Sequence, residues 1–214
     1  MATKIMSIFT VTQLSKDPWV WVAKDFLSNE ECQHLIKLTE GKLQPSPLYD
    51  DTSGSNHRDD AVRSSTNTFL KVYQDEIVTT IENRIGKLTN IPIEYGEGLQ
   101  LLNYQVGQLY KPHYDFFKPT TPKVQEYLTK YGQRITTVCM YLNTVEEGGC
   151  TFFPKIGLEI WPIKGTALIW HSVNPTTGIL EEDTMHEAES VTKGEKWMAT
   201  KWYRNLPFQH IIGK

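Results

Sequence analysis

Residues 110–115 read Tyr-Lys-Pro-His-Tyr-Asp. On an extended strand, side chains two positions apart point to the same side. His113 and Asp115 have that spacing, so the segment can present an imidazole nitrogen and a carboxylate oxygen to one point. These are two of the three ligands of a two-histidine, one-carboxylate site, which leaves coordination positions open on iron(II). The segment therefore predicts a metal centre carried by a strand.

The third ligand has to come from the histidines that follow, which are His171, His186 and His210. His210 lies in the C-terminal tail, and His171 directly follows the apolar segment 166–170 and remains a competitor. A second His-x-Asp pattern occurs at residues 57–59, but it lies in a polar stretch where no predicted strand would hold its geometry. We interpret that pattern as solvated loop residues.

His186 is preferred because of the sequence HEAESVTKGEKW that it begins, residues 186–197. The Lys-Gly-Glu at 193–195 predicts a hairpin turn, so Lys196 is expected on the strand beside His186. A cation beside a metal ligand can hold the far carboxylate of a dicarboxylic acid while the near end chelates the metal. Lys196 precedes the apolar Trp-Met-Ala, which argues against an ordinary surface lysine.

The surrounding sequence predicts an α+β fold. From residue 99 on, short β-branched and aromatic segments alternate with Gly and Pro, which is typical of an antiparallel sandwich or barrel. Helices are expected before these strands, the first with a capping box of Ser28 and Glu31. The expected elements are a loose leader (1–17), a strand (19–26), helices (29–40 and 73–88), a long polar loop (44–62) and a short helix within 121–132.

Composition narrows the class of protein. The 214 residues suit one domain, 1–214, and the formal net charge of −3 with no basic cluster argues against nucleic-acid binding. Three widely spaced cysteines argue against a disulfide framework or a zinc site. No apolar run is long enough for a secretory signal or a membrane span, so we expect a cytoplasmic protein without a membrane partner.

Four segments together carry a family resemblance: NYQVGQLYKPHYDFF, YLNTVEEGGCTFFP, WPIKGTALIW and MHEAESVTKGEKWMATKWYR. In their order and spacing they resemble the prolyl 4-hydroxylase family of Fe(II)- and 2-oxoglutarate-dependent dioxygenases, in its short single-domain bacterial or viral type. The resemblance covers about residues 19–204. It implies a double-stranded β-helix, a jelly-roll barrel, with iron near one open end.

The resemblance also implies roles for single residues. His113, Asp115 and His186 would hold iron. Lys196 would anchor 2-oxoglutarate with help from Tyr104 and Thr151. The residues expected around a proline-containing peptide are Arg63, Glu97, Tyr110, Arg134 and Trp202.

The implied reaction is hydroxylation of peptidyl proline, coupled to decarboxylation of 2-oxoglutarate to succinate and CO2, with O2 as oxidant and ascorbate as reductant. The 44–62 loop is expected to act as a lid over the peptide. The sequence departs from the family pattern at Cys150, Glu187 and Ser190, which affects the expected substrate preference rather than the iron site.

Two other functions fit the same residues. An oxygenase with the same cosubstrate could act on another protein side chain or on free proline. A non-catalytic jelly-roll binding module could retain the residues without turnover, although the complete set of ligands with Lys196 argues against it. The sequence leaves the oligomeric state open.

Overall fold

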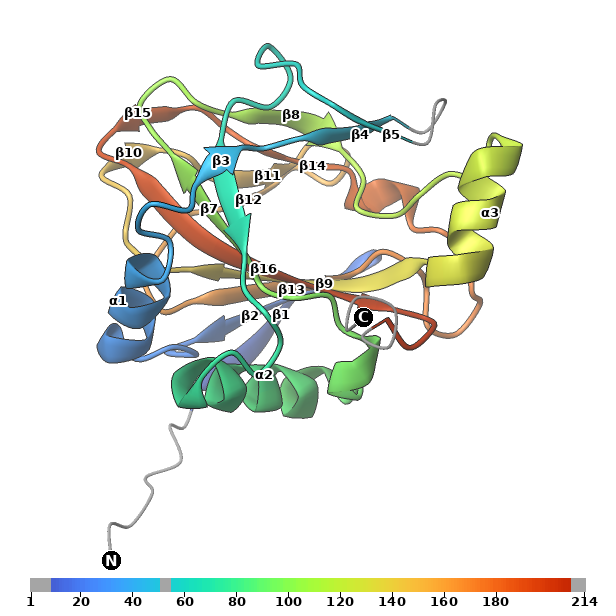
Figure 1. Ribbon diagram of the computed structural model, residues 1–214, viewed down its shortest axis with the longest axis horizontal. Coiled ribbons are helices and arrows are strands. Elements are labelled where there is room, and N and C mark those ends of the chain that lie inside the picture. Colours follow the sequence, from blue (N-terminus) through green and yellow to red (C-terminus); the bar gives the residue numbers. More distant parts are fainter. Residues whose placement is uncertain (1–8, 51–54, 209–214) are drawn as a thin grey trace, which may run out of the picture.

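The computed structural model describes residues 9–50 and 55–208. Within those residues two antiparallel sheets face each other and helices cover the outer side of the larger one (Figure 1), which confirms the α+β prediction and matches a double-stranded β-helix. The larger sheet has the order β1 (Thr10–Lys16), β2 (Trp19–Lys24), β13 (Ala167–His171), β9 (Arg134–Tyr141), β16 (Lys196–Arg204), β7 (Gln100–Tyr104), β6 (Thr66–Phe69) and β3 (Gln44–Pro45).

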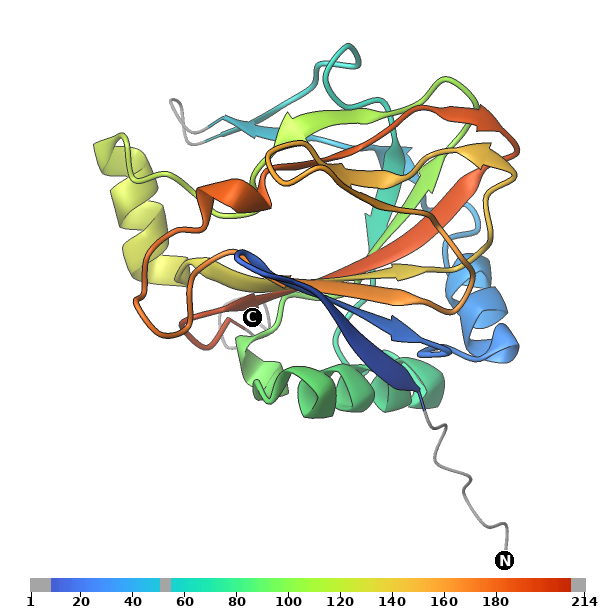
Figure 2. The same cartoon turned by 180° about the vertical axis from the view of Figure 1, so that it is seen from behind.

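The smaller sheet lies across from β9, β16 and β7 and is also visible from behind (Figure 2). Its order is β12 (Leu158–Ile160), β11 (Thr151–Phe153), β14 (His186–Ala188) and β8 (Tyr110–His113). Two short pairs complete the strands of the described residues: β10 (Glu147–Gly148) with β15 (Val191–Lys193), and β4 (Leu48–Asp50) with β5 (Ser55–His57).

The first helix begins at its predicted capping box, whereas the second begins later than predicted. Helix α1 (Asn29–Lys37) has the expected capping box of Ser28 and Glu31, but it ends three residues before the predicted end at 40. Helix α2 (Glu76–Thr89) begins later than the predicted residue 73, because the side chain of Asp75 accepts a hydrogen bond from the Val78 amide and caps it there.

The short helix expected within 121–132 is present as α3 (Pro122–Tyr131), which ends before Gly132 at a φ of +74°. The 3-10 helices are η1 (Ile93–Tyr95) and η2 (Glu182–Thr184). No helix of the described segments is long and apolar enough to span a bilayer.

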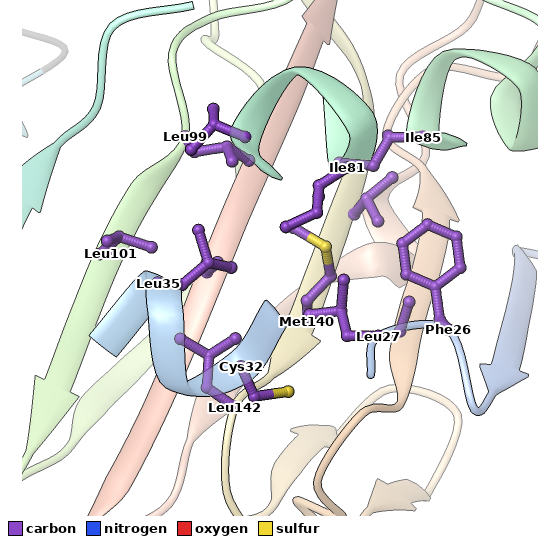
Figure 3. Close-up of a cluster of buried hydrophobic side chains, with 14 of the residues drawn as sticks. Phe26, Leu27, Cys32, Leu35, Ile81, Ile85, Leu99, Leu101, Met140 and Leu142 are labelled. Atoms are coloured by element: carbon purple, nitrogen blue, oxygen red, sulfur yellow. The ribbon is translucent and has the colours of Figure 1, made fainter. Parts of the chain in front are cut away.

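A hydrophobic core joins α1 and α2 to the outer face of the larger sheet (Figure 3). Leu35 of α1 and Ile81 and Ile85 of α2 are fully buried there, and burial of each such side chain contributes about 1.5–3 kcal/mol. A second core fills the space between the two sheets and includes Phe153 and Trp170. With both faces packed, the larger sheet forms a rigid base for the residues that point between the sheets.

Two sequence expectations are wrong in part. Residues 10–16 of the predicted leader form β1, and residues 1–8 lie outside the described part of the chain. The predicted 44–62 loop contains β3 and the hairpin strands β4 and β5. The described side chains of β1 and β5 are mostly exposed, so no alternation of polar and apolar residues reveals them in the sequence.

Candidate active site

The three predicted iron ligands come together at one end of the smaller sheet. His113 of β8 and His186 of β14 are directly opposite each other in the strand pairing. Asp115 lies two residues past the end of β8, in a bend rather than on the strand as predicted. One ligand atom from each residue lies within 4.8 Å of the others, and His186 Nε2 is 3.9 Å from Asp115 Oδ2. This arrangement suits a single ion with three protein ligands.

Backbone carbonyl groups orient both imidazoles. His113 Nδ1 donates to the carbonyl oxygen of Lys111 at 2.8 Å, and His186 Nδ1 donates to that of Thr184 at 2.9 Å. Because each Nδ1 carries the proton, each Nε2 keeps its lone pair for a metal. Burial, followed by the neighbouring His186, holds the pKa of His113 well below its usual value and favours the neutral ring.

The carboxylate ligand is oriented in the same way. Thr137 of β9 donates its hydroxyl proton to Asp115 Oδ2 at 2.6 Å, and both side chains are buried. No sequence motif singles out Thr137. It lies next to Thr136 on β9, where neighbouring side chains point to opposite faces of the strand, and only the packing of the segment after β8 against β9 shows that Thr137 rather than Thr136 meets Asp115.

The competing histidines lie elsewhere. His171 ends β13, packs against the rings of Trp19 and Trp21 at 5.8 and 5.2 Å, and its Nδ1 is 2.8 Å from the Thr136 hydroxyl. His57 is exposed on β5. His210 lies outside the described residues.

Lys196 does not lie on the strand beside His186, so the predicted hairpin between the two residues is wrong. After β14 the chain forms β15, which pairs with β10, and then crosses to the larger sheet. There Lys196 begins β16 and lies opposite Tyr104 of β7. The turn at 193–195 thus carries the chain from one sheet to the other, so that the lysine reaches the space between the sheets from the opposite wall.

The Lys196 ammonium is fully buried and has no hydrogen-bond partner among the described residues. Its Nζ lies 5.4 Å from the ring centroid of Tyr104 and 5.7 Å from that of Tyr141. Tyr141 in turn donates its hydroxyl proton to Thr151 Oγ1 at 2.8 Å. Burial lowers the pKa of Lys196 to about 8.

A buried cation without a partner is costly unless an anion joins it. The residues around Lys196 therefore fit a dicarboxylic acid such as 2-oxoglutarate, with its far carboxylate at the ammonium. Tyr104 and Thr151, the two predicted helpers, both line the narrow pocket beside the iron ligands. Tyr141 is a further polar neighbour that the sequence does not reveal, since its position in an apolar strand is also typical of a core residue.

A cavity of about 480 Å³ lies beside the iron ligands, and His113 and Asp115 are among the residues that line it. Four of the five predicted substrate residues line it, namely Arg63, Tyr110, Arg134 and Trp202. Tyr110 stacks on the His113 ring with centroids 3.5 Å apart. The Arg134 guanidinium lies 3.7 Å from the centroid of the Trp202 ring.

Glu97, the fifth predicted substrate residue, does not line the cavity. Its buried carboxylate accepts hydrogen bonds from Arg134 at 2.6 and 2.8 Å and from Arg204 at 2.8 Å. Burial raises the pKa of Glu97, and the two arginines outweigh that effect and lower it. Glu97 therefore holds Arg134 in place from behind.

Comparison with known proteins agrees with this site. The model of the 2OG-Fe(II) oxygenase superfamily matches residues 99–204. Prolyl 4-hydroxylase 5 of Arabidopsis thaliana is 41% identical over 219 residues, covering 93% of this chain and 72% of the relative. Prolyl 4-hydroxylase 2 of the same plant is 35% identical, covering 98% of this chain and 75% of the relative.

Solved structures share the fold. The viral collagen prolyl hydroxylase of Paramecium bursaria Chlorella virus-1, in its 2OG complex, superposes with a TM-score of 0.69 at 26% identity and covers 90% of this chain and 99% of its own. A prolyl-4-hydroxylase of Pseudomonas putida superposes with a TM-score of 0.60 at 18% identity, covering 87% of this chain and 92% of its own.

The sequence match and the geometry of the ligands lead to the same conclusion. The protein is an oxygenase whose cofactor is iron(II), held by His113, Asp115 and His186, and whose cosubstrate is 2-oxoglutarate. The chain belongs to the prolyl 4-hydroxylase family of the 2OG-Fe(II) oxygenase superfamily.

Proposed function

We propose that this enzyme hydroxylates proline residues within extended peptides or proteins, with ascorbate as reductant. The observation that carries the proposal is a pair of buried donors beside the cavity: Arg63 Nε and Trp202 Nε1 have no hydrogen-bond partner among the described residues. An extended peptide offers carbonyl oxygens at regular intervals to such donors. A free amino acid has no peptide carbonyl of this kind.

The cavity also suits a polyproline-II conformation. Such a helix has no internal hydrogen bonds, and aromatic rings bind its proline rings. The Tyr110 ring stacks on the His113 ring, and the Trp202 ring lies against the Arg134 guanidinium. Two flat aromatic rings therefore lie close to the iron ligands. A peptide lying across these rings would bring a proline ring to the metal.

Iron and 2-oxoglutarate, when bound, supply the oxidising chemistry, and the chain supplies position. His113, Asp115 and His186 hold the metal and leave coordination positions open. Lys196 holds the far carboxylate of the cosubstrate, and the hydroxyl groups of Tyr104 and Thr151 are placed to help. Asp115 and His186 are buried, which limits the access of water to this centre.

The hairpin of β4 and β5 is proposed as a lid over the peptide. Pro47, Leu48, Tyr49 and Asn56 line the cavity from this side. Arg63 connects the hairpin to the site, because its Nη1 donates to the Pro47 carbonyl at 3.0 Å while its guanidinium lies 4.5 Å from the centroid of the Tyr110 ring. Movement of the hairpin would therefore act directly on substrate-facing groups.

The test is mass spectrometry of a short proline-repeat peptide and of free proline after incubation with iron(II), 2-oxoglutarate and ascorbate. The proposal requires a mass gain of one oxygen on peptide proline and much slower turnover of the free amino acid. Equal turnover of both would favour a small-molecule oxygenase. Absence of product together with absence of 2-oxoglutarate consumption would favour a binding module.

A further inference from the structure

An aromatic cluster lines the end of the cavity next to α3. Tyr49 of β4, Phe117 in the segment after Asp115 and Tyr127 of α3 all line the cavity. Their ring centroids lie 5.1 Å (Tyr49–Phe117), 5.4 Å (Tyr49–Tyr127) and 5.0 Å (Phe117–Tyr127) apart. Tyr49 and Tyr127 are half-buried residues, and both are among the residues that line the cavity. This cluster is separate from the rings that lie at the iron ligands.

Arg134 connects the aromatic cluster to the iron side of the cavity. Its guanidinium lies 3.7 Å from the Trp202 ring centroid and 5.2 Å from the Phe117 ring centroid. Trp202 also lines the narrow pocket with the iron ligands, whereas Phe117 and Tyr127 line only the larger cavity. The cavity therefore continues from His113 and Asp115, past Arg134, to α3. A bound peptide that follows the cavity meets the aromatic cluster.

Arg204 fixes the aromatic cluster from behind. This side chain is almost fully buried, and its Nη2 lies 3.0 Å from the Tyr127 hydroxyl, to which it donates. Its Nη1 donates to the Gly132 carbonyl at 2.7 Å, at the end of α3, and its Nε donates to Glu97 at 2.8 Å. One guanidinium thus joins α3 to the carboxylate that also holds Arg134. A ring held this firmly loses little entropy when a ligand contacts it.

We propose that Tyr49, Phe117 and Tyr127 form a second subsite, which binds a flanking proline of the peptide, and that Arg204 is its positioning residue. The inference rests on the proposed peptide substrate. A polyproline-II helix has three residues per turn and rises about 3.1 Å per residue, so residues about three positions apart present the same face. The enzyme therefore selects a target proline by a second proline about one turn away.

The experiment compares three peptides of equal length: one with a single proline, one with a second proline three residues before it and one with a second proline three residues after it. The readout is the ratio of kcat/KM for two prolines to that for one. For wild type we expect a ratio of about five to ten, as one ring stacked on aromatic side chains would give. Tyr127→Ala should bring the ratio close to one.

Three variants distinguish a subsite from a general effect on folding. Tyr127→Phe keeps the ring but loses the hydrogen bond from Arg204, so its ratio should lie between those of wild type and Tyr127→Ala. Tyr131→Ala removes a neighbouring ring of α3, 4.8 Å from Tyr127, that is not among the described residues lining the cavity, and should keep the wild-type ratio. Arg204→Lys should lower the ratio while the KM for 2-oxoglutarate stays unchanged. The proposal is overturned if wild type does not distinguish the peptides, or if Tyr131→Ala abolishes the ratio as fully as Tyr127→Ala.

A binding measurement separates this inference from the proposed function. The same peptides are titrated calorimetrically into the iron(II)- and 2-oxoglutarate-loaded protein without oxygen. A preference in Kd that Tyr127→Ala removes supports the subsite even if no hydroxylated product forms. Equal Kd values for all three peptides in wild type refute it, whether or not the enzyme hydroxylates peptide proline.

Discussion

Lys196 on β16 lies directly opposite Tyr104 on β7, and its buried ammonium is 5.4 Å from the centroid of the tyrosine ring. No carboxylate of the described residues forms an ion pair with this ammonium, although the protein contains other buried cations that are paired. Lys201 on the same strand, for example, is 2.7 Å from a Glu82 carboxylate oxygen. Lys196 thus differs from a structural lysine in having a charge that no carboxylate of the described residues matches and that an anionic ligand would match.

Replacement of Lys196 by Ala should weaken 2-oxoglutarate binding by about tenfold or more, because a charge-assisted hydrogen bond contributes about 1.5–3 kcal/mol. The measurement is a titration of 2-oxoglutarate against turnover. Lys193→Ala serves as the control, since this exposed lysine of β15 pairs with Glu146 at the surface. An unchanged titration in Lys196→Ala would refute the assignment.

The pH dependence of cosubstrate binding should follow the same side chain. Burial lowers the pKa of free Lys196 to about 8, and a bound carboxylate would raise it again. The pKa of Lys196 is therefore higher in the complex than in the free protein. The apparent affinity for 2-oxoglutarate should be highest below pH 8 and should fall by up to about tenfold per pH unit as the pH rises above 8. The apparent affinity for 2-oxoglutarate is measured from pH 6.5 to 9.5. Lys196→Arg, which stays charged, should show a flatter profile, and equal slopes would contradict the prediction.

Lys196 shows which features of the site can be predicted from the sequence and which cannot. The lysine and its ligand role were predicted from the motif that follows His186, whereas its sheet was predicted wrongly. A Lys-Gly-Glu turn is compatible both with a hairpin and with a crossover between sheets, because Gly194 at a φ of +79° permits either. Only the pairing of β15 with β10 decides between them.

The same limit applies to contacts between residues that are far apart in the sequence. His113 and Asp115 are two positions apart in the sequence, so local spacing predicts that they meet, although Asp115 lies in the bend after β8 rather than on the strand. The contacts of Arg204 with Glu97 and Tyr127 join positions far apart in the chain. No local pattern indicates such long-range contacts, which arise when α3 packs against the end of the larger sheet.

Replacement of His113 by Ala should abolish stoichiometric iron(II) binding and turnover, since it removes one of three ligands. Iron content per chain is measured by elemental analysis after reconstitution. His171→Ala is the matched control: this histidine packs against Trp19 and Trp21 and should leave iron content at one per chain. Loss of iron in His171→Ala with retention in His113→Ala would show that the ligands are assigned wrongly.

Thr137→Val should lower iron affinity by about 10- to 100-fold, the usual cost of losing a partner that orients a metal ligand. Valine keeps the shape of the side chain but cannot donate to Asp115 Oδ2, which Thr137 now contacts at 2.6 Å. Iron(II) is titrated against activity at saturating 2-oxoglutarate. Thr136→Val changes the neighbouring residue, whose hydroxyl contacts His171, and should have little effect on the titration. Equal effects of the two variants would argue for a general disturbance of β9.

Replacement of residues 48–60 by a short Gly-Ser link should reduce the advantage of a proline-repeat peptide over free proline, while iron binding persists. The iron ligands lie on β8, β14 and the bend after β8, none of which includes the replaced segment. The cavity wall, in contrast, loses Leu48, Tyr49 and Asn56.

A peptide long enough to reach that wall loses contacts and shielding in the variant, whereas free proline has few contacts there to lose. We expect kcat/KM for the peptide to fall about tenfold or more, with a smaller change for free proline and an unchanged KM for 2-oxoglutarate. A parallel fall for both substrates would show that the hairpin supports the metal centre rather than the peptide. An unaffected peptide would place the substrate elsewhere on the protein.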